Sequence, residues 1–182
     1  MIFTTYTPEE KCIWLNNFHL KKERNRNIVI ATLIILAVLS RLVPHPPNFA
    51  PITGIALFSS KKINNKLFSV FIPIIPLFIS DLFIGISFIN IFVYISFIII
   101  YFLGFMSTKI EVKTVFLSSI IFFILTNLGV WYLGYPRNIE GLIACFTLAL
   151  PFFVNTILGD LFYSFILFRS FKSAKKFKLI SA

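Results

Sequence analysis

The chain has 182 residues, of which 58% are hydrophobic, 18% aromatic and only 13% charged, and its formal net charge is +10. Soluble domains are about 45–50% apolar and about 25% charged, so the composition excludes an ordinary soluble domain. The apolar residues occur in long uncharged runs, which indicates a one-domain membrane protein with no room for a soluble catalytic domain.

Residues 1–27 are polar enough to lie outside the bilayer as a cytoplasmic segment. Thr7, Pro8 and Glu10 fit an N-cap, a first helical position and a capping-box glutamate, which predicts a short helix over residues 8–22. Trp14 would anchor this helix at the membrane surface. A cleaved signal peptide is disfavoured, because the first apolar run is followed by Arg41 and prolines rather than by a small-residue cleavage site.

The membrane domain, residues 28–169, contains six apolar segments that we interpret as spans. They are residues 28–43, 49–60, 67–85, 88–107, 114–133 and 141–168. The second segment is short for a crossing of about 20 residues, and a re-entrant segment is the alternative. Prolines are expected to kink the third segment, at Pro73 and Pro76, and to bend the sixth, at Pro151. Residues 170–182 form a basic tail.

The positive charges decide the topology. If the second segment crosses, 15 of the 17 Lys and Arg residues lie on one side, and only Arg41 and Arg137 lie on the other. If it does not cross, ten of the fifteen move to the other side. The crossing version fits the positive-inside rule, so we predict an all-α six-span bundle in the inner membrane with both termini cytoplasmic. The same distribution argues against a nucleic-acid partner.

The stretch from Arg41 to Gly54 is the most irregular part of the chain. It holds four prolines together with His45 and Asn48. Proline has no N–H to donate and restricts the residue before it, so a regular helix is excluded there. We predict an outward-facing loop over residues 44–48 that gates a pocket in the bundle.

Polar residues inside spans usually face the bundle or a cavity. Asp160 is deep in the sixth segment, with Asn155 and Thr156 close before it, and it is either a ligand or proton site or a buried structural hydrogen bond. Asn127 and Trp131 are four residues apart and share a helix face, which suits a planar polar ligand or contact between helices.

Three residues near the outer loops are further candidates for the pocket. Asp81 is either part of the site or a helix-end cap, and Arg41 either holds an anionic group or contacts lipid headgroups. His45 is included as a pocket residue, although a lone exposed histidine more often binds no metal. The sequence predicts neither a metal nor a cofactor, and Cys12 and Cys145 do not suggest a disulfide.

Motifs of catalysis are missing from the sequence. The seven glycines are scattered and form no phosphate-binding loop, and no Gly-x-Ser-x-Gly or His-Glu-x-x-His pattern occurs. The acidic pair Asp81 and Asp160 is expected at different depths, whereas an intramembrane enzyme needs two groups at one depth. We therefore predict that the protein is not an enzyme.

Four stretches resemble a family of small bacterial integral membrane proteins of unknown function. They are the PHPPNFAPI stretch in residues 40–52, Ser80-Asp81, the TNLGVW stretch in residues 122–131, and residues 141–160 with the PFFVNTILGD stretch. The resemblance covers residues 28–168 and implies no particular activity.

The layout is also distantly similar to the substrate-binding S components of energy-coupling-factor vitamin transporters. That resemblance implies six spans, a pocket capped by the outer loops and coupling subunits as partners. Those components commonly carry two alanines four apart on the first span, whereas Ala31 and Ala37 are six apart here. The chain therefore works with such subunits, with another partner or alone.

Polar and aromatic residues converge on the outer half of the predicted bundle. We therefore predict that the protein binds or takes up a small solute, such as a vitamin or a corrinoid-like compound, through an outward-facing pocket. Asn127, Trp131, Asn155 and Asp160 are expected to line it. The alternative is a non-catalytic structural or assembly protein in which these side chains hold helices together.

Overall fold

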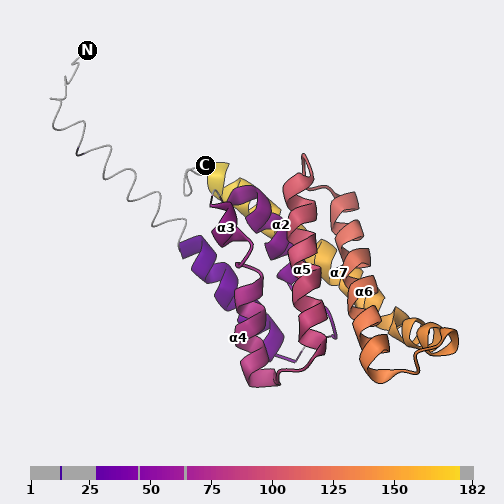
Figure 1. Cartoon of the computed structure of the whole chain (residues 1–182). Coiled ribbons are helices and arrows are strands. Elements are labelled where there is room, and N and C mark those ends of the chain that lie inside the picture. Colours follow the sequence, from indigo (N-terminus) through magenta and orange to yellow (C-terminus); the bar gives the residue numbers. More distant parts are fainter. Residues whose placement is uncertain (1–12, 14–27, 45, 64, 177–182) are drawn as a thin grey trace, which may run out of the picture.

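The computed structural model describes Ile13 and residues 28–44, 46–63 and 65–176, and its regular structure there is entirely helical (Figure 1). The helices are Ile28–Leu42, α2 (Ile52–Lys62), α3 (Lys66–Ser69), α4 (Ile74–Ile84), α5 (Ile89–Met106), α6 (Val112–Gly134) and α7 (Ile139–Lys176). The predicted all-α fold is confirmed for this part of the chain. Apart from Ile13, the predicted surface helix over residues 8–22 lies outside the described residues, as does His45.

Four helical segments are long and apolar enough to cross a membrane. They are Lys66–Ile84, Ile89–Met106, Val112–Gly134 and Ile139–Ser173. They coincide with the third to sixth predicted spans. The first and second predicted spans correspond to the shorter apolar helix Ile28–Leu42 and to α2, which has only 11 residues.

The helix connections lie at two ends of the bundle (Figure 1). Residues 43–44, 46–51, 85–88 and 135–138 form the end that carries Arg41 and Arg137, which we call the arginine end. Residues 63, 65 and 107–111 form the opposite end, beside Lys62, Lys66 and Lys109, which we call the lysine end. Helices α4, α5 and α6 run side by side between the two ends, and α7 crosses them at a steep tilt.

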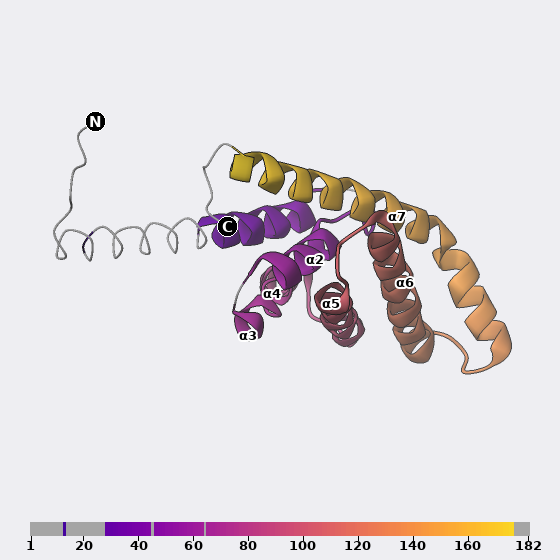
Figure 2. The same ribbon diagram turned by 90° about the horizontal axis from the view of Figure 1, so that it is seen from above.

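Helix α2 occupies the centre of the molecule. Every residue from Ile52 to Ser60 is buried, because α2 packs against α5, α6 and α7 and shares a core with the helix Ile28–Leu42 (Figure 2). A helix surrounded by protein does not need to match the thickness of the lipid. This explains how so short an apolar helix occupies the middle of the bundle.

Small residues allow the neighbours of α2 to approach closely. A Cβ atom added to Gly104 on α5 would lie only 3.0 Å from a methyl group of Leu57 and close to the Ser60 hydroxyl. A Cβ atom added to Gly54 on α2 would lie 3.2 Å from the backbone nitrogen of Ser164 on α7. Glycine at such positions is typical of helix contacts inside membranes, where close packing replaces the hydrophobic drive of water.

The prolines act in two ways. The third predicted span is interrupted by a turn at residues 70–73, so that α3 ends at Ser69 and α4 begins after Pro73. This differs from the predicted kink, because the chain leaves the helical path before Pro73. Pro151 instead lies inside α7, and α7 changes direction along its length (Figure 2). Its missing N–H removes one hydrogen bond to the preceding turn.

Candidate functional site

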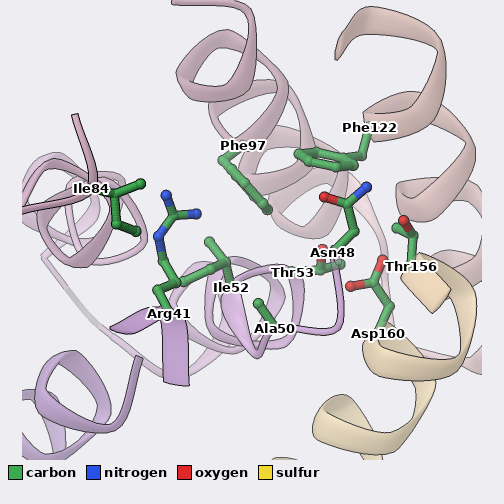
Figure 3. A pocket seen from close by; sticks show the side chains of 10 residues that line it. All are labelled: Arg41, Asn48, Ala50, Ile52, Thr53, Ile84, Phe97, Phe122, Thr156 and Asp160. Atoms are coloured by element: carbon green, nitrogen blue, oxygen red, sulfur yellow. The ribbon is translucent and has the colours of Figure 1, made fainter. Parts of the chain in front are cut away.

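The segment between the helix Ile28–Leu42 and α2 lacks regular structure. The backbone N–H of Phe49 donates to the carbonyl oxygen of Pro46 over 3.0 Å and closes a tight turn. Asn48 in this turn has a φ of +64°, a left-handed conformation that asparagine adopts more readily than most residues. The turn brings Asn48 to the edge of a cavity between α2, α5, α6 and α7 (Figure 3).

This cavity has a volume of about 180 Å³, and we call it the Asp160 cavity. Its polar lining consists of Arg41, Asn48, Thr53, Thr156 and Asp160. Its apolar lining consists of Ala50, Ile52, Ile84, Phe97 and Phe122. In Figure 3, Arg41 and Asp160 lie on opposite sides, and the aromatic rings form a wall along the cavity.

Asp160 is one of the least accessible side chains of the site. It is 2% exposed, and the Ser119 hydroxyl on α6 donates to its Oδ2 atom over 2.7 Å. Thr156 lies one helical turn earlier on the same face of α7, and Thr53 reaches the cavity from α2. Among the described residues, no basic side chain pairs with Asp160. Hydroxyl groups therefore surround this carboxyl group.

Asp81 lies in a different environment, next to Arg41 on the other side of the cavity. It is 3% exposed, and its Oδ1 atom accepts a hydrogen bond from Nη2 of Arg41 at 2.5 Å. The Tyr94 hydroxyl donates to its Oδ2 atom over 2.6 Å. Arg41 also donates through Nε to the Ser80 hydroxyl at 2.5 Å. This Arg41–Asp81–Tyr94 cluster ties the helix Ile28–Leu42 to α4 and α5.

A second cavity of about 350 Å³ lies between α5, α6 and α7, and we call it the Asn127 cavity. Its lining includes Thr126, Asn127, Tyr135 and Cys145, and Asn48 borders both cavities. The Asn127 side chain donates to the Phe123 carbonyl oxygen over 2.7 Å, so one of its two donor hydrogens is used within α6. The turn at Asn48 thus lies between the Asp160 cavity and the Asn127 cavity.

The predicted pocket residues divide into three groups. Arg41, Asn48 and Asp160 share the Asp160 cavity, whereas Asn127 lines the neighbouring one. Asp81 stands behind Arg41 as its ion-pair partner.

Trp131 and Asn155 line neither cavity. The indole Nε1–H of Trp131 donates to the Pro136 carbonyl oxygen over 3.0 Å and thereby braces the connection between α6 and α7. The guanidinium of Arg137 lies 4.3 Å from the ring centre of Tyr132 in the same region. This aromatic group therefore serves the loop at the arginine end.

Sequence reasoning did not single out Thr53, Ser119 or Phe97. Hydroxyls inside apolar helices commonly bond to their own backbone, so Thr53 and Ser119 are ordinary residues for their segments. Phe97 is one of many phenylalanines in the chain. The Ser119 hydroxyl lies 3.2 Å from the Val115 carbonyl oxygen and 2.7 Å from Oδ2 of Asp160, and its single hydrogen favours the shorter contact. Only the packing of α2, α5 and α6 around Asp160 distinguishes them.

No group of three or more His, Cys, Asp or Glu side chains in the described part of the chain is placed to hold a metal ion. The arrangement instead offers hydrogen-bond donors, acceptors and an aromatic wall. These are the features of a small-molecule site.

The fold places the protein among helical membrane proteins, with a polar cavity inside the bundle. The chain belongs to a family of unknown function (DUF6580), whose model matches residues 21–181. This confirms the predicted membership of an uncharacterised family. Searches of curated proteins and of solved structures each found no match.

Proposed function

We propose that this protein crosses the cytoplasmic membrane six times and binds a small solute through a pocket that opens to the outer face. The observation that carries the proposal is the Asp160 cavity, which Arg41, Asn48 and Asp160 line together. Uptake of that solute, with coupling subunits or alone, would be the corresponding activity.

The charge distribution supports this orientation. The lysine end holds Lys61, Lys62, Lys66, Lys109 and Lys113, whereas the arginine end holds Arg41 and Arg137. Positive charge marks the cytoplasmic side, so the lysine end would lie inside. The Pro44–Asn48 loop and the cavity mouth would then face outward.

The irregular backbone of residues 43–51 also supports a pocket. Irregular backbone at membrane depth is tolerated only where protein covers it or where it lines a cavity. Asn48 and Ala50 from this segment both line the Asp160 cavity.

The size of the cavity favours a compact solute. At about 180 Å³, the Asp160 cavity is smaller than typical drug-sized sites of about 300–1,000 Å³. A corrinoid would not fit within it, whereas a small metabolite would. Asn48 borders the Asn127 cavity as well, so movement of this loop would enlarge the space.

The test is mass spectrometry of small molecules that remain bound to gently purified protein. We expect one compound to accompany the wild type and to be lost in Asp160→Ala, since this change removes the polar centre of the cavity. Trp131→Ala is the matched control, because Trp131 lies outside both cavities, and it should retain the compound. An empty wild type under several growth conditions would overturn the proposal.

The alternative is a structural or assembly role. The Arg41–Asp81–Tyr94 cluster favours it, because that cluster joins three helices through an ion pair and a hydrogen bond. In that case Asp160→Asn would change stability, and no solute would ever stabilise the wild-type protein.

A further inference from the structure

The charges around the Asp160 cavity are unevenly compensated. The guanidinium of Arg41 already pairs with Asp81, so this ion pair is close to neutral. Asp160 is equally buried, yet no cation pairs with it among the described residues. A buried carboxylate is costly unless a positive group or several hydrogen bonds accompany it. The cavity therefore lacks a positive group beside Asp160.

The groups near Asp160 offer acceptors to an incoming donor. The Thr156 hydroxyl gives its own hydrogen to the Phe152 carbonyl oxygen over 2.9 Å, which leaves its oxygen free to accept. The hydroxyls of Ser119 and Thr53 both hydrogen-bond to the Asp160 carboxylate. A carboxylate has about four acceptor sites, so it keeps capacity for a further donor. An ammonium group has three hydrogens to donate and one positive charge, and it fits this set of acceptors.

The opposite side of the cavity offers donors. Arg41 has five N–H groups and uses one to Ser80 and one to Asp81, so three remain. The amide of Asn48 adds a further donor at the same cavity. Between the two sides, the rings of Phe97 and Phe122 lie 5.1 Å apart and provide an apolar wall.

We propose that the solute is a small zwitterion of the amino-acid class, with its ammonium group at Asp160 and Thr156 and its carboxylate toward Arg41 and Asn48. Its apolar part would lie against Phe97 and Phe122. This inference rests on the proposed function and names the chemical class of the solute. The volume of about 180 Å³ suits such a compact molecule.

The test compares three probes that share the isobutyl side chain of leucine. Leucine carries both charged groups, 3-methylbutylamine lacks the carboxylate, and 4-methylpentanoate lacks the ammonium group. Binding to purified protein in lipid nanodiscs is measured by calorimetry and by thermal shift. We expect leucine to bind most tightly, the amine to bind about tenfold more weakly and the acid about 100-fold more weakly, because each lost charge-assisted contact is worth about one to two orders of magnitude.

Asp160→Asn keeps the shape of the side chain and an acceptor for Ser119 but removes the negative charge. We expect it to weaken leucine and amine binding at least about tenfold while leaving acid binding unchanged. Thr156→Val is a second variant that removes one acceptor, and it should weaken the same two probes. Trp131→Ala is the control and should bind all three probes like the wild type.

Three outcomes would overturn the inference. They are acid binding equal to leucine binding, an equal loss of all three probes in Asp160→Asn, and stabilisation of the wild type by sodium chloride alone when compared with choline chloride. If a solute without an amine co-purifies and is lost in Asp160→Ala, the inference fails while the proposed function stands. If no probe binds and no solute is retained, both fail.

Discussion

Asp81 and Asp160 are two buried carboxylates on two sides of the same cavity region, and they differ in what surrounds them. Asp81 receives a guanidinium and a phenol, which together satisfy both of its oxygens. Asp160 receives hydroxyls from Ser119 and Thr53, has no cation as a partner among the described residues, and faces a cavity. A carboxylate that is paired with a cation of its own protein serves the fold, whereas one that faces a cavity without such a cation can serve a ligand.

The largest effect on folding is expected from Asp81→Ala. The change leaves the guanidinium of Arg41 without its partner in a mostly buried site, since the Arg41 side chain is only 22% exposed. We expect a loss of about 2–3 kcal/mol in the free energy of unfolding, measured by reversible unfolding in mixed detergent micelles.

The double variant Arg41→Met, Asp81→Leu is the control for this loss. It should recover most of the stability, because neither charge remains buried alone. If the double variant is as unstable as Asp81→Ala, the pair is not what holds these helices together.

A smaller effect is expected when each carboxylate loses one hydroxyl group that donates a hydrogen bond to it. Tyr94→Phe and Ser119→Ala should each lower the free energy of unfolding by about 1 kcal/mol, the usual net value of one hydrogen bond. Only Ser119→Ala should also weaken solute binding, measured by calorimetry on the same preparations. Equal effects of the two variants on binding would contradict the distinction between the two carboxylates.

The smallest effect on stability is expected from Asp160→Asn. The amide keeps an oxygen for Ser119 and loses the unpaired charge, so the free energy of unfolding should change by less than about 1 kcal/mol. Thermal unfolding of the ligand-free protein provides the measurement. A loss of unfolding free energy as large as that of Asp81→Ala would mean that Asp160 serves the fold, as Asp81 does.

Much of the candidate site could be anticipated from residue types. Arg41, Asn48, Asp81 and Asp160 stand out because charged or special residues are rare in apolar segments. Their partners could not be anticipated, because Asp81 could have been a cap and Arg41 a headgroup contact. Trp131 shares a face with Asn127 by spacing, yet its indole turns to the Pro136 carbonyl, and the spacing alone gives no hint of this bond.

The sequence by itself determined the helical class, the four long apolar segments and the separation of Arg41 and Arg137 from the other basic residues. These features follow from local composition, because an uncharged apolar run of about 20 residues predicts a membrane-spanning helix by itself. Only the tertiary structure decided that the short α2 becomes the buried centre and that Asp160 has no cation as a partner in the part of the chain that the structure describes. Both depend on which helices pack together, and residues as distant in the chain as Ser119 and Asp160 meet only through that packing.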